Sequence, residues 1–411
     1  MTRNFLRGCR ACSPLPQRGD AIVQWEDMKS DSDRGRSARA ALGTGDTQPP
    51  PLATRARTSV LPKVERQSGQ IINPQRPRYE SLQELGSGGL GTVELAQDND
   101  IGRRVAVKRL LPEASSPGDV LRFAEEVRTV GMLEHPNIAP IHDVGIDDRG
   151  RYFFVMKHVE GETLEKIIER LAAGDADAHA RYTFETRTRI FLGVLQALAF
   201  AHARGVIHRD IKPANVMVGP CGEVMLMDWG LSARSETRVD PPESLSGTPP
   251  YMAPEQVRGA ELGDERSDIY AAGVLFYELL TLRHYLPTCT NVLEILANVE
   301  NHEPIPARFV SSPHQSNVPP ELSFFVAKAM KKEPSERYQS VAEMIAALTA
   351  IQRGDIRAQC PRTFLKRVTF RAMRYSYAHA TASILLAALA LVVFGWGIFS
   401  VMARLASLLA S

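Results

Sequence analysis

The sequence predicts an α+β fold, in which short strands come early in the ordered part of the chain and helices follow them. Residues 92–96 alternate as a β-strand does, and residues 105–108 supply a second, mostly apolar strand. Residues 190–203 and 271–282 are apolar at lengths typical of helices and predict buried helices. A third signal is the run 380–402, which carries no formal charge over 23 residues and predicts one C-terminal transmembrane helix.

Length and composition limit the class of protein. At 411 residues the chain can form one large or two average domains. A formal net charge of +2 argues against a nucleic-acid-binding protein, because that task needs a concentrated basic surface. The five cysteines are scattered, so no disulfide framework is expected and a reducing compartment fits. We interpret the Cys9-x-x-Cys12 pair as two free thiols, because no second pair or nearby histidine completes a metal site.

Composition divides the chain into five regions. Residues 1–78 are basic and Pro-rich without lasting apolar periodicity, so we predict that they are disordered. Residues 79–350 form the predicted folded domain, and 351–379 form a basic segment before the predicted membrane helix 380–402. Residues 403–411 would be a short tail on the far side of the membrane.

A glycine-rich run lies at the start of the folded region. It fits the pattern Gly-x-Gly-x-x-Gly-x-Val, in which glycines let the backbone approach phosphate groups and donate N–H bonds. Dinucleotide-binding turns share these glycines, but such a turn opens into a helix, whereas here a strand follows and then a turn at 99–102. We therefore predict a phosphate-binding hairpin, whose residues are Leu85, Gly86, Ser87, Gly88, Gly89, Leu90, Gly91, Thr92 and Val93.

Residues 208–215, His-Arg-Asp-Ile-Lys-Pro-Ala-Asn, place a carboxylate, an ammonium and a carboxamide in one short loop. Phosphoryl transfer to a hydroxyl needs such a set. Asp210 can accept the hydroxyl's proton, Lys212 can neutralise charge on the moving phosphoryl group, and Asn215 can hold a metal ion. The alternative interpretation of the octapeptide alone is a polar surface loop without chemistry.

In this order and at this spacing, the motifs resemble those of the bacterial Hanks-type serine/threonine protein kinases over residues 79–350. The resemblance implies a bilobal protein-kinase-like fold, with a small β-rich lobe and a large helical lobe. It implies that Lys212 is the Ser/Thr-type choice in the catalytic loop. It also implies that the threonine of Gly247-Thr248 hydrogen-bonds the catalytic aspartate and lysine.

Lys108 closes a predicted strand, where an inward ammonium is costly unless it meets an anion. The resemblance implies that ATP phosphates and one acidic helix residue supply that charge. Glu126 is our choice, because it lies nine residues before His135, the spacing of related kinases. Glu125 is the alternative and is expected to be a solvated helix residue.

Asp228-Trp229-Gly230 stands where these kinases have Asp-Phe-Gly. Asp228 is therefore expected to bind Mg²⁺ together with Asn215, with Mn²⁺ as the alternative ion. Trp229 departs from the family pattern. We expect the larger ring to pack beneath the helix that carries Glu126, which puts free flipping of this segment in doubt. The resemblance also implies an ATP-binding set of Ala106, Lys108, Met156, Lys157, Val159 and Met217.

The resemblance implies that residues 231–255, which end in an Ala-Pro-Glu motif, form the activation segment. Glu255, in the Ala-Pro-Glu motif, is expected to form a structural ion pair with Arg337. Asp268 is expected to tether the backbone of the catalytic loop. Arg209 precedes Asp210 and is expected to pair with a phosphate on the activation segment. The candidates for that phosphorylation are Thr237, Ser244 and Ser246, with Thr248 as a weaker one.

The implied function is ATP-dependent phosphorylation of Ser or Thr in proteins. One alternative is a membrane-tethered pseudokinase scaffold, which usually shows a lost catalytic Lys, Asp or Asn, whereas all three stand here. A small-molecule kinase is the other alternative, and it would be expected to lack the peptide-docking segment 247–255.

The C-terminal region predicts attachment to a lipid bilayer. More basic residues precede the run 380–402 than follow it, so the positive-inside rule places the kinase on the cytoplasmic side of the cell (inner) membrane as a single-pass protein. The alternative for this run is a buried helix of a soluble protein. A short helix before it would lie in the headgroup region, and the alternative is a solvated linker helix. A second copy of the chain is a candidate partner for trans-phosphorylation. The apolar face of the short helix is predicted from Phe364, Leu365, Val368, Ala372 and Tyr375, and its cationic face from Lys366, Arg367 and Arg374.

Overall fold

The computed structural model describes residues 63–64, 71–72, 76–88, 91–114, 116–230, 233–234, 247–259, 263–289, 291–355 and 359–409. Most of the region 1–78, predicted to be disordered, lies outside these residues. Within it, β1 (Lys63–Val64) pairs antiparallel with β2 (Ile71–Ile72), which departs from the expectation that this region has no regular structure.

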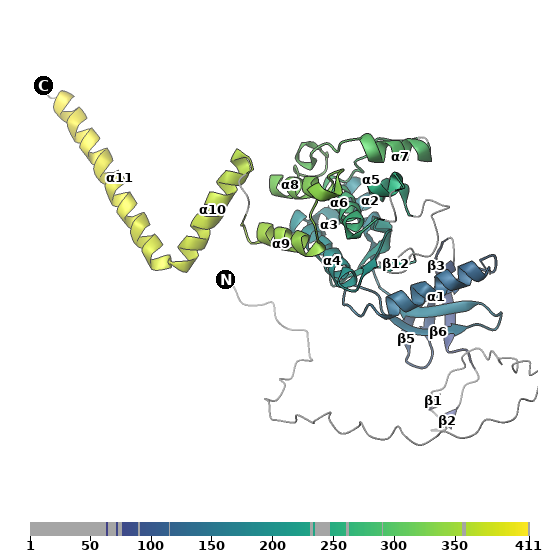
Figure 1. The fold of residues 1–411 in the computed structure, drawn as a ribbon. Coiled ribbons are helices and arrows are strands. Elements are labelled where there is room, and N and C mark those ends of the chain that lie inside the picture. The colour runs from purple at the N-terminus through teal and green to yellow at the C-terminus, as the bar shows by residue number, and fades with distance from the viewer. Residues whose placement is uncertain are drawn as a thin grey trace, which may run out of the picture. The chain divides into compact units, whose positions relative to one another are not determined.

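A five-stranded antiparallel sheet forms the first lobe (Figure 1). It consists of β3 (Tyr79–Ser87), β4 (Gly91–Asp98), β5 (Arg103–Leu110), β6 (Ile141–Ile146) and β7 (Tyr152–Lys157). The order in the sheet is β3-β4-β5-β7-β6. β4 and β5 form the hairpin predicted from residues 92–96 and 105–108. Gly102 in their turn has φ +75°, which glycine adopts without steric cost.

The helix α1 (Pro117–Gly131) packs against this sheet. Ser116 caps its first turn, because the Ser116 hydroxyl accepts a hydrogen bond from the Asp119 N–H at 3.2 Å. The ring of Phe123 in α1 lies 5.4 Å from that of Phe154 in β7, and Leu110 of β5 joins the same apolar cluster. This packing holds α1 close to β5, the strand that carries Lys108.

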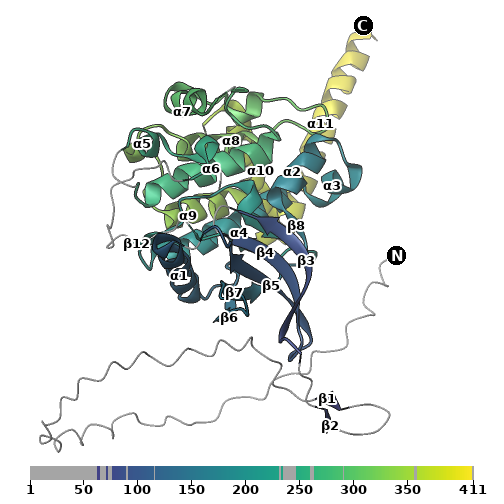
Figure 2. The ribbon, with the colours of Figure 1, turned by 90° about the vertical axis from the view of Figure 1, so that its right-hand side faces the viewer.

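Helices dominate the second lobe (Figures 1 and 2). They are α2 (Leu164–Ala172), α3 (Ala176–Arg181), α4 (Phe184–His202), α5 (Pro254–Val257), α6 (Glu265–Thr281), α7 (Val292–Asn301), α8 (Pro320–Ala329) and α9 (Val341–Gln352). Short 3-10 helices are η1 (Pro213–Asn215), η2 (Pro249–Tyr251), η3 (Ala307–Phe309) and η4 (Pro334–Glu336). A three-stranded sheet has the order β11 (Val224–Leu226), β10 (Val216–Val218), β8 (Glu162–Thr163). A two-stranded sheet pairs β12 (Ala233–Arg234) with β9 (Val206–Ile207). The predicted α+β fold with a β-rich and a helical lobe is confirmed.

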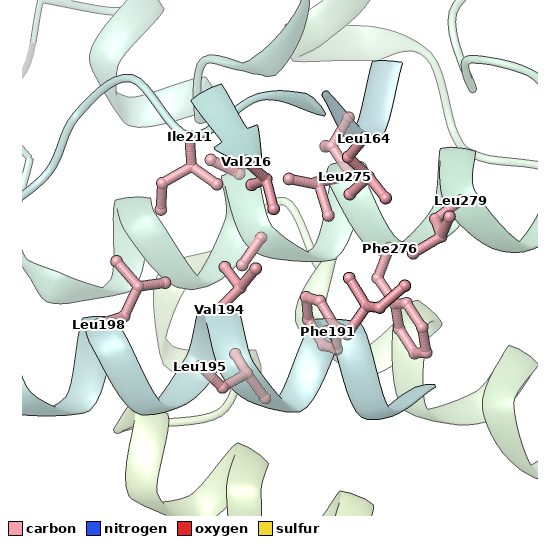
Figure 3. Close-up of a cluster of buried hydrophobic side chains, with 14 of the residues drawn as sticks. Leu164, Phe191, Val194, Leu195, Leu198, Ile211, Val216, Leu275, Phe276 and Leu279 are labelled. Carbon is pink, nitrogen blue, oxygen red and sulfur yellow. The ribbon is translucent and has the colours of Figure 1, made fainter. Parts of the chain in front are cut away.

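The predicted buried helices 190–203 and 271–282 correspond to α4 and α6, which pack together in the core (Figure 3). Phe191 of α4 stacks on Phe276 of α6, with ring centroids 4.1 Å apart. Ile211, from the run 208–215, is 1% exposed and belongs to the same cluster. Burying such a side chain contributes about 1.5–3 kcal/mol, so the core anchors the loop that carries Asp210.

The small and polar residues 172–180 would indicate a surface loop from their composition alone. The structure instead has a helix there, because α3 begins at Ala176. Asp175 caps this helix by accepting a hydrogen bond from the Ala178 N–H at 3.0 Å, and Ala178 is 1% exposed. Alanine has the highest helix propensity, so a local cap and a small buried face were enough to form the helix.

Two helices follow, α10 (Pro361–Ala378) and α11 (Ala380–Leu409). Across the described residues, no helix combines the length and the apolar character needed to cross a bilayer. The transmembrane helix predicted at 380–402 is therefore not supported by the structure.

The predicted faces of the helix before it are partly as expected. Phe364, Leu365 and Val368 of α10 are exposed to solvent. Lys366, which was expected to face lipid headgroups, instead pairs with Glu321 of α8 at 2.7 Å. The Glu321 side chain is mostly buried, so an ion pair with Lys366 compensates its charge.

Candidate active site

Asp210 lies at the centre of the site, where three side chains hold its carboxylate. Oδ1 accepts a hydrogen bond from the Thr248 hydroxyl at 2.6 Å. Oδ2 accepts hydrogen bonds from the Lys212 ammonium at 2.7 Å and from the Asn215 amide at 3.0 Å. Lys212 also donates to the Thr248 hydroxyl at 2.8 Å, which closes a triangle of contacts. Burial opposes ionisation of Asp210, but the hydrogen bonds from Lys212 and Thr248 outweigh it and lower the pKa of Asp210.

Asp268 of α6 tethers the backbone just before Asp210, as predicted. Its Oδ2 accepts a hydrogen bond from the His208 N–H at 2.8 Å, and its Oδ1 accepts one from the Arg209 N–H at 2.9 Å. Arg209 has φ +67°, a conformation that costs a non-glycine residue about 1–3 kcal/mol. The two bonds from a buried carboxylate hold the loop in this conformation.

Lys108 of β5 meets Glu126 of α1, the partner preferred over Glu125. The distance from Lys108 Nζ to Glu126 Oε1 is 2.6 Å, and Glu126 is buried whereas Glu125 is exposed. Burial opposes charge on Lys108, but Glu126 and Asp228 outweigh it and raise the pKa of Lys108. Burial also raises the pKa of Glu126, against the opposing charge of Lys108. We treat the pair as ionised at neutral pH, because a 2.6 Å contact with a cation stabilises the carboxylate directly.

Asp228 and Asn215 offer oxygen ligands to a cation. The Asp228 side chain is 48% exposed, and its Oδ1 lies 3.4 Å from Lys108 Nζ. The amide nitrogen of Asn215 donates to the Asp210 carbonyl at 2.8 Å and to the Asp210 carboxylate, which leaves the amide oxygen for a cation. Among the described residues, no group of three or more His, Cys, Asp or Glu side chains could hold a metal. An ion bound by this pair would therefore need further oxygens from water or phosphate, as Mg²⁺ commonly takes.

The glycine-rich hairpin has one glycine that the fold requires and two beside open space. A Cβ atom on Gly91 would lie 2.5 Å from the Arg109 carbonyl oxygen, so a larger residue there would displace the β4–β5 pairing. Gly86 has no atom within 4 Å of such a Cβ, and Gly88 has only the Gly91 oxygen at 4.0 Å. Gly89 and Leu90, also predicted to bind phosphate, lie outside the described residues.

Other residues of the predicted ATP-binding set are arranged on β5, β7 and β10. Ala106 of β5 is paired in register with Met156 of β7. Val159 lies in an apolar cluster against which Met217 of β10 packs. The Lys157 N–H donates to the Pro140 carbonyl at 3.1 Å, so Lys157 can offer a ligand only its carbonyl from the main chain.

The close of the activation segment is held by the ion pair that the sequence predicted. The Arg337 guanidinium donates to both oxygens of Glu255, at 2.7 and 2.6 Å. Burial opposes ionisation of Glu255, but the hydrogen bonds from Arg337 outweigh it and lower the pKa of Glu255. The predicted phosphorylation candidates Thr237, Ser244 and Ser246 lie outside the described residues.

Trp229 is 2% exposed and belongs to the large buried cluster that also includes Val130 of α1. That its ring packs directly beneath α1 stays a prediction. Its ring lies 4.5 Å from that of His208. The His208 ring in turn bonds the backbone on both sides, accepting from the Asp210 N–H at 3.2 Å and donating to the Met227 carbonyl at 3.1 Å.

Sequence reasoning missed His202, the last residue of α4. Its Nε2 lies 2.8 Å from Asp268 Oδ2, so it contacts the group that tethers the catalytic loop. The signal was present, because His202 is a titratable residue at the end of the apolar run 190–203 and six positions before His208.

Comparison with known proteins agrees with this geometry. The protein kinase domain family matches residues 79–348. A probable serine/threonine-protein kinase of Streptomyces coelicolor is 35% identical over 286 residues, which is 68% of this chain and 40% of that protein. Serine/threonine-protein kinase PknB of Mycolicibacterium smegmatis is 36% identical over 285 residues, 68% of this chain and 43% of the relative. Serine/threonine-protein kinase PknD of Protochlamydia amoebophila is 33% identical over 292 residues, 65% of this chain and 29% of the relative. The chain thus matches less than half the length of these relatives, and it belongs to the protein kinase domain family.

Proposed function

We propose that this chain transfers the γ-phosphate of ATP to serine or threonine hydroxyls of proteins. The observation that carries the proposal is the Asp210 carboxylate, which Lys212, Asn215 and Thr248 hold through hydrogen bonds of 2.6–3.0 Å. The names of the three relatives, all serine/threonine-protein kinases, support the same reaction.

Asp210 would orient the substrate hydroxyl and accept its proton. Its two oxygens offer about four lone pairs, and three are used by the bonds to Thr248, Lys212 and Asn215. The remaining one, on Oδ1, can accept a hydrogen bond from a substrate hydroxyl. Because the pKa of Asp210 is lowered, it is a weak base, and we infer that it aims the hydroxyl and takes the proton late in the transfer.

Two lysines would supply positive charge to the phosphates. Lys212 lies against Asp210, where the transferred phosphoryl group must pass, and would stabilise charge on it. Lys108, held by Glu126, would contact the phosphates that stay on the nucleotide. Mg²⁺, when bound by Asn215 and Asp228, would neutralise charge between the phosphates, and Mn²⁺ is the alternative ion.

The nucleotide would lie between the glycine-rich hairpin and the second lobe. The open space beside Gly86 and Gly88 would admit phosphates. Gly89 and Leu90, which lie outside the described residues, belong to the same proposal. Val93 is paired in register with Lys108, so hairpin and lysine would approach the nucleotide together. The rest of the ATP-binding set comprises Leu85, Ser87, Gly91, Thr92, Ala106, Met156, Lys157, Val159 and Met217.

The alternative, a pseudokinase scaffold, would bind partners without this chemistry. The contacts among Lys108, Glu126 and Asp228 argue against it, because they cost desolvation energy that a pure scaffold would not need.

The test is phosphorylation of protein by full-length chain with Mg-ATP, followed by phosphoamino-acid analysis. Asp210→Asn should reduce the rate by roughly 100- to 10,000-fold, because it removes the proton acceptor and leaves nucleotide binding intact. Lys108→Met should reduce the rate and weaken nucleotide binding. An Asp210→Asn variant with wild-type activity, or phosphate found only on small molecules, would contradict the proposal.

We also propose that the C-terminal segment attaches the kinase to the cell membrane from the cytoplasmic side, where a second copy can phosphorylate it. The uncharged run 380–402 supports this, as do exposed apolar residues of α11. These residues are Leu391, Val392, Val393, Phe394, Trp396 and Phe399.

Deleting residues 378–411 should move the protein to the soluble fraction and make autophosphorylation depend on protein concentration. The measurement is fractionation with high-salt and carbonate washes. A truncated protein that stays with the membranes would rule out this segment as the anchor.

A further inference from the structure

His202 links α6 to the catalytic loop without touching the reacting groups. The residue is 7% exposed, and its Nε2 lies 2.8 Å from Asp268 Oδ2. Its Nδ1 is buried without a hydrogen-bond partner in the described structure and lies 3.7 Å from Glu265 Oε2. Both ring nitrogens therefore face carboxylates, an arrangement that favours the doubly protonated imidazolium.

Asp268 needs such a cation. It is 1% exposed and accepts hydrogen bonds from the N–H groups of His208 and Arg209 and from His202. A buried carboxylate is strongly destabilising unless it is paired. His208 does not provide the charge, because its Nδ1 accepts a hydrogen bond from the Asp210 N–H while its Nε2 donates to the Met227 carbonyl, which is the neutral form. The Arg209 guanidinium attracts Asp268 from the loop side, and His202 provides the charge from the α4 side.

We propose that His202 is a positioning residue for phosphoryl transfer, whose imidazolium holds the Asp268 carboxylate in the orientation that fixes the backbone of His208 and Arg209 and thereby aims Asp210. The inference deepens the proposed kinase function and rests on it for its activity readout. The line of contacts runs from His202 through Asp268 to two successive N–H groups, the second of which belongs to the residue before Asp210.

Protonation of His202 gives this arrangement a pH dependence. The charged groups that face His202 are Asp268 and Glu265 of α6 and Asp264, which caps that helix. The neutral His208 lies on the far side of Asp268. Burial opposes protonation, but the hydrogen bond and charge of Asp268 outweigh it and raise the pKa of His202 above its ordinary 6.5. The stabilisation that the His202 imidazolium gives to the Asp268 carboxylate is therefore complete below pH 6.5 and is lost as the pH rises through the raised pKa.

The test compares three variants of the full-length protein. His202→Gln places an amide N–H near the position of Nε2, so it keeps the bond to Asp268 but cannot carry charge. His202→Leu removes both, and His142→Gln replaces an exposed histidine of β6 as the matched control. We expect kcat of His202→Leu to fall about 10-fold or more at neutral pH with KM for ATP almost unchanged, because misplacement of Asp210 affects the chemical step. His202→Gln should lose the alkaline decrease of kcat that the wild type and His142→Gln show.

A second measurement keeps the inference testable if activity is weak. In protein with ¹³C-labelled histidine, the resonance absent from His202→Gln belongs to His202, and it should titrate above pH 6.5. Titration below 6.5, or an alkaline decrease of kcat that persists in His202→Gln, would overturn the inference. The inference would also be overturned if the His202 variants lost stability in thermal unfolding while the pH profile of kcat of the folded protein stayed unchanged. A wild type without kinase activity at any pH would refute the proposed function instead, and the titration would still decide the charge of His202.

Discussion

Replacing Arg337 by methionine should lower the free energy of unfolding of the helical lobe by more than a substitution at the surface does. The Arg337 side chain is fully buried, and all five of its N–H groups are used. Four go to Glu255, Arg266 and Lys332, at 2.6–2.8 Å. The fifth, on Nε, donates to the Lys331 carbonyl at 2.7 Å. Methionine fills a similar volume but satisfies none of these acceptors.

The magnitude follows from what is left behind. Removing one partner of a buried ion pair costs about 3–5 kcal/mol, because the other charge stays buried. Glu255 would keep a hydrogen bond from the Ser267 hydroxyl at 2.8 Å, so we expect about 4 kcal/mol rather than the upper limit. For a domain of this size that corresponds to a decrease in Tm of roughly 10 °C. Arg258→Met is the matched control, because Arg258 is 43% exposed and its contacts to Glu300 and Glu333 are 3.5 and 3.6 Å long. Such a surface pair contributes about 0–1 kcal/mol.

Urea denaturation followed by tryptophan fluorescence measures both variants. The pH dependence gives a second check, because the pKa of Glu255 is lowered from its ordinary 4.5. The stability that the ionised Glu255 contributes is present above pH 4.5 and is lost as the pH falls through the lowered pKa. The difference in free energy of unfolding between wild type and Arg337→Met should therefore become smaller in acid. If Arg337→Met lowered the free energy of unfolding by less than about 1 kcal/mol at neutral pH, as expected for Arg258→Met, the buried ion pair would not stabilise the lobe as argued.

Two further predictions concern the first lobe. Glu126→Gln should lower kinase activity by at least about 10-fold in a phosphorylation assay, because Lys108 loses its charged partner. Glu125→Gln is the control and should leave activity unchanged, because Glu125 is exposed. Equal effects of the two substitutions would count against the assigned pair. Gly91→Ala should lower the free energy of unfolding by about 1–3 kcal/mol, because the new Cβ would meet the Arg109 carbonyl oxygen. Gly86→Ala should lower it much less, because a Cβ there meets no atom within 4 Å. A larger loss of stability in Gly86→Ala than in Gly91→Ala would show that the hairpin is arranged differently.

Most of the site could be predicted because its residues lie in short motifs. Lys108, Asp210 and Asp228 come from separate elements, yet each is recognisable within a few neighbours in sequence. Contacts that depend on the register of distant elements were harder. The spacing to His135 pointed to Glu126, whereas nothing local showed that His202 faces Asp268, 66 positions away. The helix α3 was missed because its cap, Asp175, reads equally well as a loop residue. The membrane helix was predicted from the length and lack of formal charge of the run 380–402, whereas no helix among the described residues is long and apolar enough to cross a bilayer.

The strain in this site is held by residues that do no chemistry. In the described part of the chain, three non-glycine residues have positive φ, and two of them, Arg209 and Asp228, adjoin the site. His208 connects both segments, since its backbone N–H donates to Asp268 and its ring donates to the carbonyl of Met227, the residue before Asp228. Because His208 is fully buried against Trp229, its ring cannot move without disturbing the core. The positions of the predicted base and the predicted metal ligand are therefore coupled through one buried imidazole, so a change that shifts either segment should shift the other.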